Sequence, residues 1–267
     1  MLAGAAAVSL LLIAGSGGHR VSPPKPKPKP TPIAAQTDAL RHLTDLGLPV
    51  YCGAATGRDV ALTFDDGPGP YTHFAIDALR RARARATFFL VGRNLPGREQ
   101  LVRSELTVGE LANHTYTHPW LPSLDAAAAA EEMFRAQGAI GTAGGAPVSL
   151  FRPPYEGRTP AIDAQARALG MLQILWDVDS RDWAGADHNG IARNVIRGLR
   201  PGSIFLMHEN RGQTIRALRK ILPALRRKRL RAVTVSELLA HNPPSDAQVR
   251  AGPRGCPLIA RAGRTAS

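Results

Sequence analysis

The stretch LTFDDGPGPYTH, residues 62–73, places two adjacent carboxylates, Asp65 and Asp66, directly after an apolar run. Like charges so close together repel each other, so the pair needs a physical reason to exist. Gly67 and Pro68 follow at once. The stretch therefore predicts a buried strand whose end carries reactive polar groups.

Strand and helix patterns alternate on both sides of this stretch. Apolar runs at 60–64, 86–91, 172–178 and 203–208 are typical of buried parallel strands. Helical patterns fill the intervals at 72–84, 98–106, 124–137, 160–169, 190–199 and 214–228. Repeated βα units predict an α/β fold with one parallel sheet, open or closed into a barrel.

The two ends of the chain differ in composition from this body. Residues 1–18 carry an apolar stretch of signal-peptide length, so we expect a signal peptide or a membrane anchor, which would tether the protein to a membrane. Residues 19–36 include PPKPKPKPTP, which predicts an extended, positively charged linker. We assign 37–242 to a single catalytic domain and 243–267 to a C-terminal tail that is loose apart from Cys256.

The chain of 267 residues has a formal net charge of +13, which predicts an anionic binding partner. Nucleic acid, an anionic membrane face and an acidic cell-wall polymer are the candidates. The basic runs at 80–85 and 226–231 lie at the ends of helical patterns, and we interpret them as solvated helix ends. They contain no aromatic platform, so we expect an anionic cell wall and no nucleic acid.

The chain has two cysteines, Cys52 and Cys256, and no CxxC motif. Thiol chemistry and a thiolate metal site are therefore not expected. Two interpretations of the pair stay open: a disulfide that ties the ends of the domain together, or two unlinked thiols. The disulfide would add about 4–5 kcal/mol in the chain-entropy model.

Polar clusters follow the strand-like runs at five places: 65–66, 113–118 (NHTYTH), 151–156 (FRPPYE), 177–183 (DVDSRDW) and His208. The carboxyl ends of parallel strands meet at one rim, where the active sites of barrels and open α/β sheets are assembled. The five clusters together predict an active site at that rim.

His114 and His118 are four residues apart, a spacing that places both rings on one face of a helical turn. Two imidazoles and one carboxylate make a known catalytic zinc shell with a position open for water. One Asp of the pair can hold the cation, whose charge relieves the repulsion, and its neighbour is then free to take a proton from water. Zinc is the first expectation, and Co²⁺ or Ni²⁺ also tolerates these ligands.

Five motifs, TFDDGP, HTYTH, RPPY, DSRDW and LMH, occur in this order between about residues 58 and 242. They closely resemble the motifs of the polysaccharide deacetylases of the NodB-homology type, carbohydrate esterase family 4. The resemblance implies a distorted (β/α) barrel. It also implies that Asp66, His114 and His118 hold the metal and that Asp65 is the general base.

The same resemblance assigns the remaining site residues. Arg152 would orient Asp65, the backbone N–H of Tyr155 would stabilise the oxyanion, and His208 would be the general acid. One carboxylate of DSRDW, Asp179 or Asp182, would favour the protonated form of His208. Trp183 and Trp120 would stack on a sugar ring. The family commonly has Gly after RPPY, whereas this chain has Glu156, so the loop conformation or subsite preference at that corner is expected to differ.

We therefore expect an exported, extracellular or wall-associated hydrolase that removes N-acetyl groups from N-acetylglucosamine residues of peptidoglycan or a chitin-type polymer. An amine leaves only when its nitrogen is protonated, which is why an acid is needed together with the base. One alternative is an O-acetyl esterase acting on xylan or another acetylated glycan. The other is a non-catalytic glycan-binding module, which would be expected to lack a base, ligand or acid.

Overall fold

The computed structural model describes Met1 and residues 32–145 and 148–257. The expected signal peptide or anchor, apart from Met1, and the linker up to residue 31 lie outside the described residues. Within the described ranges, no helix is long and apolar enough to cross a membrane.

Eight strands form one sheet, and every pairing within it is parallel. The order is β5-β4-β3-β2-β1-β7-β6, and β8 pairs with the start of β1. The strands are β1 Asp59–Gly67, β2 Ala86–Leu90, β3 Gly109–Asn113, β4 Leu150–Phe151, β5 Leu172–Gln173, β6 Val178–Asp179, β7 Ile204–His208 and β8 Arg231–Val233. The sheet curls into an open half-barrel, which confirms the predicted fold class.

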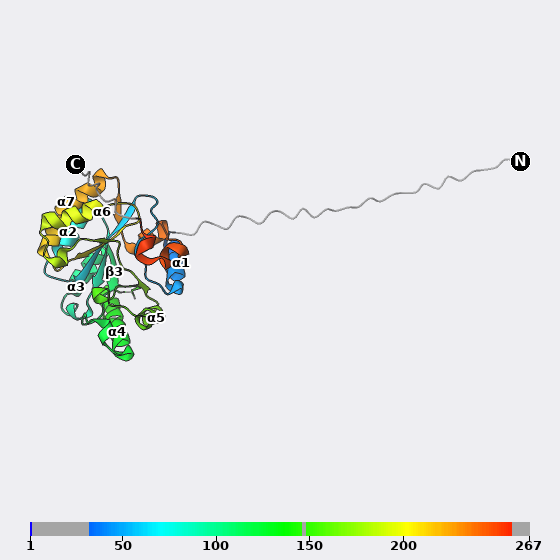
Figure 1. The fold of residues 1–267 in the computed structure, drawn as a ribbon, viewed down its shortest axis with the longest axis horizontal. Helices are drawn as coiled ribbons and strands as arrows, with labels where there is room; N and C mark the ends of the chain where they lie inside the picture. The colour runs from blue at the N-terminus through cyan, green and yellow to red at the C-terminus, as the bar shows by residue number, and fades with distance from the viewer. Residues whose placement is uncertain (2–31, 146–147, 258–267) are drawn as a thin grey trace, which may run out of the picture. The chain divides into compact units, whose positions relative to one another are not determined.

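Helices surround this sheet, as Figure 1 shows. They are α1 Pro32–Leu46, α2 Thr72–Ala82, α3 Glu99–Leu106, α4 Ala126–Gly144, α5 Pro160–Ala168, α6 His188–Gly198, α7 Gly212–Arg227, α8 Val235–His241 and α9 Asp246–Arg250. The largest buried cluster combines side chains of β1, β2 and β7 with those of α2, α3, α4, α6 and α7. A second cluster joins the other face of the strands to α1 and α8.

Three expectations from the sequence are corrected. The run 172–178 is not one strand: β5 and β6 are two-residue strands at opposite edges of the sheet, and residues 174–177 connect them. Helix α1 begins at Pro32, inside the range assigned to the linker. The tail is not loose before Cys256, because it forms α9 and a short 3-10 helix at Gly252–Gly255.

Alternation along the strands decides what reaches the inside of the half-barrel. In β1, Val60, Leu62 and Phe64 belong to the cluster under the helices, so Ala61, Thr63 and Asp65 face the other way. The same alternation places Ile204, Leu206 and His208 of β7 on the inner side. The inner face is therefore apolar at the start of the strands and polar at their carboxyl ends.

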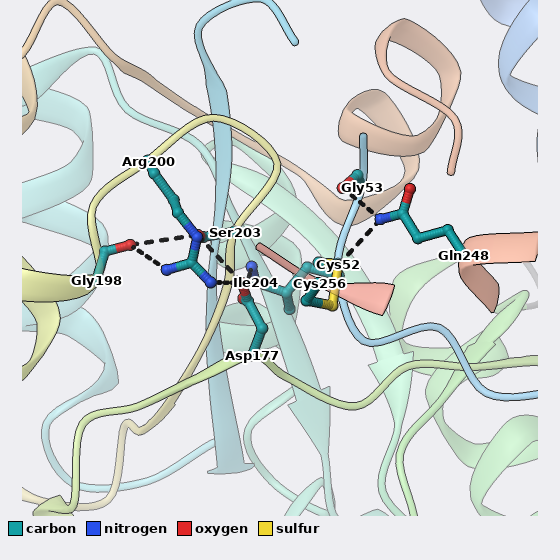
Figure 2. Close-up of a disulfide and its surroundings, with 9 residues drawn as sticks. All are labelled: Cys52, Gly53, Asp177, Gly198, Arg200, Ser203, Ile204, Gln248 and Cys256. Carbon is teal, nitrogen blue, oxygen red and sulfur yellow. Dashed lines mark hydrogen bonds and ion pairs between the residues drawn. A yellow bond between two sulfur atoms is a disulfide. The ribbon is translucent and has the colours of Figure 1, made fainter. Parts of the chain in front are cut away.

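Cys52 and Cys256 form a disulfide, so the first of the two interpretations holds. Figure 2 shows this bond beside Asp177, whose side chain is 4% exposed. Gln248 donates to the Cys52 sulfur at 3.2 Å and to the Gly53 carbonyl at 3.1 Å. The bridge and these bonds fasten the C-terminal segment to the start of the domain.

Candidate active site

Asp65 and His208 are neighbours in the sheet. Asp65 of β1 pairs in register with His208 of β7, and both side chains leave their strands on the inner face. The two residues therefore stand next to each other although 142 other residues separate them along the chain. Both line a cavity of about 750 Å³ at the carboxyl end of the sheet.

Strand alternation alone would turn Asp66 away from Asp65. The pairing of β1 with β2 shifts between Asp65 and Gly67, and Asp66 has φ 70°, so a local irregularity brings the second carboxylate back toward the cavity. Asn210 donates to Asp66 Oδ2 at 3.1 Å, and Asn94 donates to the Asp66 carbonyl at 3.0 Å. The bulge thus allows adjacent carboxylates to serve the same cavity.

The two histidines do not lie on a helical turn, which corrects the expectation from their spacing. They belong to the loop after β3, in which Thr115 and His118 both have φ 66°. Glu132 of α4 holds this loop by accepting the N–H groups of Tyr116 and Thr117 at 2.9 and 2.7 Å. The left-handed conformation of Thr115 and His118, and not a helical turn, directs both imidazole rings into the cavity.

Asp66, His114 and His118 present ligand atoms that all lie within 4.8 Å of one another. Asp66 Oδ1 is 3.7 Å from His114 Nε2 and 3.1 Å from His118 Nε2. In a tetrahedral site with bonds of about 2.0–2.1 Å, ligand atoms lie roughly 3.3–3.4 Å apart. The spacing and the donor types therefore fit one zinc-like divalent ion.

The protonation states also suit a metal. His114 Nδ1 is 2.7 Å from the Arg152 carbonyl, which can only accept, so Nδ1 carries the proton and Nε2 keeps its lone pair. Burial lowers the pKa of His114, which keeps the imidazole neutral. Burial opposes the charge of Asp66, but the neighbouring imidazoles outweigh it and hold the pKa of this carboxyl well below its usual range.

Arg152 is fully buried and binds Asp65. Its Nη1 lies 2.7 Å from Asp65 Oδ1 and 2.7 Å from Thr63 Oγ1, and Nε donates to the Ile174 carbonyl at 3.0 Å. The guanidinium carbon stands 4.0 Å from the centre of the Phe89 ring. These contacts fix one oxygen of Asp65, while the other lies 3.7 Å from His114 Nε2, one of the three atoms that could hold a metal ion.

Of the two carboxylates in DSRDW, Asp182 is the partner of His208. Its Oδ1 lies 2.7 Å from His208 Nδ1, and its Oδ2 accepts from the His208 N–H at 2.8 Å and the Thr214 hydroxyl at 2.5 Å. Burial opposes the charge on His208, but the bond to Asp182 outweighs it and raises the pKa of His208. Asp179 instead accepts from Trp183 Nε1 at 3.1 Å.

The three predicted aromatic contacts occupy different places. Tyr155 and Trp183 line the cavity and are 67% and 51% exposed, so both offer a ring to a ligand. The Tyr155 hydroxyl is 3.2 Å from His118 Nδ1. Trp120 lies at the edge, with its ring 6.4 Å from that of Tyr155 and against Gly157. Glu156 also lines the cavity, and burial raises the pKa of its carboxyl.

Sequence reasoning missed three residues that position the site: Asn94, Asn210 and Glu132. Asn210 follows His208 by two residues, so its place after a strand was a usable signal. Asn94 and Glu132 come from a short 3-10 helix and from α4, and only the tertiary structure brings them to the Asp66 and histidine loops.

The cavity of this half-barrel combines three side chains that can hold a metal ion, a free carboxylate and a partly buried His–Asp pair. This combination is typical of a hydrolase site. A family model described as polysaccharide deacetylase matches residues 53–174. The chain belongs to this family, the family 4 carbohydrate esterases, and it is a polysaccharide deacetylase by that membership.

Three relatives differ in their named substrates. The chain is 37% identical over 190 residues to a chitooligosaccharide deacetylase of Bradyrhizobium, which covers 64% of this chain and 86% of the relative. It is 36% identical to a peptidoglycan-N-acetylglucosamine deacetylase of Bacillus cereus, covering 68% and 88%. It is 39% identical to a bifunctional xylanase/xylan deacetylase of Cellvibrio japonicus, covering 64% of this chain and 26% of the relative.

Among solved structures, a family 4 carbohydrate esterase from Streptomyces lividans in complex with acetate is similar to the chain. The TM-score is 0.64 at 37% identity, and the match covers 66% of this chain and 92% of that structure. The likeness therefore includes most of the esterase and about two thirds of the present chain.

Proposed function

We propose that this protein is an exported, metal-dependent enzyme that hydrolyses N-acetyl groups of N-acetylglucosamine residues in peptidoglycan or a chitin-type polymer. One observation carries the proposal: the donors of Asp66, His114 and His118 converge in a cavity that also contains Asp65 and His208. A binding module needs a concave surface, but it has no use for a base and an acid beside a metal donor set.

Asp66, His114 and His118 would hold the cation, with zinc as the first candidate. When bound, the ion supplies Lewis acidity, which polarises the acetyl carbonyl and makes the attacking water more acidic.

Asp65 is the general base. Its Oδ1 is bound to Arg152, so Oδ2 is the oxygen that can accept the proton of the attacking water. The buried guanidinium stabilises the ionised carboxylate, which compensates for the loss of solvent around it. Arg152 therefore acts through Asp65 and never needs to touch the substrate.

His208 is the general acid. Its Nδ1–H is held by Asp182, so Nε2 is the ring atom that is free to donate a proton. Protonation of the amide nitrogen lets the C–N bond break, and the products are acetate and the free amine of the sugar. Asp182 favours the charged imidazolium before the transfer, in agreement with the raised pKa of His208.

Other groups around the cavity would stabilise the oxyanion and bind the sugar rings of the substrate. The backbone N–H of Tyr155 would stabilise the developing oxyanion, a contribution of about 2.7–4 kcal/mol for one such donor. Asp179 orients the Trp183 ring through its indole N–H, and this exposed ring is a platform for a sugar face. Trp120 would extend the platform beyond Tyr155.

The relatives named for chitooligosaccharides and peptidoglycan support the N-acetyl substrate. A second candidate is O-acetyl hydrolysis on xylan, which is favoured by the 39% identity to the xylan deacetylase relative. The apolar segment 1–18 and the charged stretch 23–32 support export and an extracellular location. The net charge of +13 supports association with an anionic cell wall.

Acetate release by the purified protein from chitooligosaccharides, peptidoglycan and acetylxylan tests the function. A chelator should abolish release, and added Zn²⁺ should restore it. Asp66→Asn should lose both metal, measured by elemental analysis, and activity, whereas Asp65→Asn should keep the metal and lose activity. Release from acetylxylan alone would select the second candidate, and no release from any substrate by the metal-loaded protein would reject both.

The acid role has its own test, because an alkoxide leaves more easily than an amine. His208→Ala should depress hydrolysis of an N-acetyl sugar far more than hydrolysis of an activated acetate ester. Equal losses on the two substrates would contradict the assignment of His208.

A further inference from the structure

A shallow groove runs between α2 and α7, outside the catalytic cavity. Its two hollows have volumes of about 400 and 300 Å³. Both are lined by residues of these two helices, and the first is lined also by Tyr71, which precedes α2. We name it the α2–α7 groove, and its exposed side chains include Tyr71, Phe74, Arg81, Arg216, Arg219 and Arg226.

The charge of this groove is of one sign. Four arginines line it, and no Asp or Glu does. In the part of the chain that the structure describes, none of the four has a carboxylate within the 4.0 Å of an ion pair. By contrast, nearby Arg80 and Arg85 pair with Asp77 and Glu237. The groove is therefore a concentrated positive surface without internal compensation.

The arginines are arranged in a line. On α7, Arg219 and Arg226 follow Arg216 by three and ten residues, so the three side chains share one face of the helix. At about 1.5 Å per residue the row extends about 15 Å along the helix axis. A row of that length suits an extended polymer better than a single small anion.

Exposed aromatic rings stand at the end of the groove nearest the cavity. Phe74 is 52% exposed and Tyr71 38% exposed, and the Tyr71 ring lies against Gly212, within 3.2 Å of where a Cβ would be. Gly212 lines the first hollow, and Arg211, the residue before it, lines the catalytic cavity. A glycan chain that leaves the cavity past Arg211 therefore meets these rings and then the arginine row.

We infer that the α2–α7 groove binds an anionic stretch of the glycan polymer, with a sugar ring on Phe74 and Tyr71 and carboxylate or phosphate groups on the arginines. The inference rests on the proposed function, because it makes the groove an extension of the substrate site. It also locates part of the +13 charge on a face that continues from the cavity. The basic ends of α2 and α7 are then part of a binding surface and not only solvated helix ends.

Cosedimentation of the full-length protein with purified bacterial sacculi tests this. One preparation keeps its phosphodiester-linked polymers, and the other has lost them by hydrofluoric acid treatment but keeps peptide carboxylates. The groove variant is Arg216→Glu with Arg219→Glu. The control is Arg103→Glu with Arg250→Glu, two exposed arginines outside the groove, so both variants carry the same change of −4 in charge. Equal melting temperatures of variant and parent establish that folding is intact.

The groove variant should bind intact sacculi about tenfold more weakly at 0.01 M salt, where the Debye length is about 30 Å, and the difference should vanish at 1 M, where it is about 3 Å. The control carries the same net charge, so it should lose less binding than the groove variant at 0.01 M salt, and its loss should also vanish at 1 M. A loss confined to intact sacculi identifies phosphate as the anion, and a loss with both preparations identifies carboxylate. Equal binding of variant and control to both preparations would overturn the inference.

Two further arms separate a glycan site from a general polyanion site. Phe74→Ala should weaken binding about threefold even at 1 M salt, since ring stacking is not screened. Duplex DNA should bind more weakly than sacculi, and equal or tighter binding of DNA would overturn the glycan assignment. Acetate release by the unmodified protein from neutral chitooligosaccharides is measured separately, so failure of the proposed activity and failure of the groove are distinguishable.

Discussion

Removing the charge of Arg152 should destabilise the fold and reveal a strong coupling to Asp65. The two side chains are 0% and 3% exposed, and Nη1 lies 2.7 Å from Oδ1. Breaking a buried ion pair by removing one partner costs about 3–5 kcal/mol, because the other charge is left without compensation. We therefore expect Arg152→Met to lower the free energy of unfolding by about 4 kcal/mol.

The double variant separates the pair from the rest of the arginine contacts. Arg152 also donates to Thr63 and to the carbonyls of Ile174 and Leu175, and these acceptors lose their partner whenever Arg152 is replaced. Asp65→Asn alone leaves the buried guanidinium unpaired and should cost about 3 kcal/mol. The double variant leaves no unpaired charge, so its loss should be about 4 kcal/mol and the coupling free energy about 3 kcal/mol.

Urea unfolding of the four proteins, followed by tryptophan fluorescence in a chelating buffer, measures the cycle, and the chelator removes the contribution of bound metal. The pair of Arg231 and Asp59 is a matched control at the other end of β1. Its closest N–O distance is also 2.7 Å and Asp59 is 1% exposed, but the Arg231 side chain is 60% exposed, so solvent screens this guanidinium and the coupling should be smaller than that of Arg152 and Asp65. A coupling below about 0.5 kcal/mol for Arg152 and Asp65 would refute the view that burial makes this pair strong.

Three other perturbations give sharp expectations. Asp182→Asn removes the interaction that raises the pKa of His208, so the basic limb of the kcat–pH profile should move to lower pH; an unmoved limb would contradict the pairing. Replacing Cys52 and Cys256 by Ser releases a loop with a sequence separation of 204, which should lower stability by up to about 5 kcal/mol, measured by thermal unfolding against the parent. Burial, together with the charges of Asp66 and Asp65, raises the pKa of Glu209 to about 8. This folded-state pKa exceeds the ordinary value of 4.5, so Glu209 loses its proton at lower pH in the unfolded chain, and stability should fall as pH rises from about 4.5 to about 8. In melting temperatures measured across this pH range, Glu209→Gln should make the fall less steep. An unchanged slope would contradict the raised pKa of Glu209.

The sequence predicted the parts of the site that depend on strand ends. Asp65 and His208 were expected at one rim because each ends an apolar run, and the register of β1 with β7 places them side by side. The His–Asp partnership was predicted only as a choice between Asp179 and Asp182, since both stand in the same short motif. The backbone between them decides for Asp182, with Arg181 at φ 58° turning the chain.

The remaining features depend on long-range contacts or on unusual backbone. Adjacent residues of a strand normally point to opposite faces, so no pattern predicts that the bulge returns Asp66 to the cavity. The spacing of His114 and His118 is equally compatible with a helix, and the contact of their loop with Glu132 of α4 decides against it. Helix α1 carried a weak signal in Leu40, Leu43 and Leu46, which are spaced by three and pack on the inner cluster.

The repulsion between Asp65 and Asp66 is resolved differently for each carboxylate. Asp65 has a permanent cation, Arg152, at 2.7 Å, whereas Asp66 has only imidazoles and the Asn210 amide around its oxygens. When His114 and His118 are neutral, the charges of Asp65, Asp66 and Arg152 sum to −1. A divalent cation held by Asp66 and the two histidines would change this sum to +1. That excess positive charge would favour the negative oxygen that develops during hydrolysis, so this one asymmetry accounts for the proposed roles of both carboxylates: Asp66 as the metal ligand and Asp65 as the base.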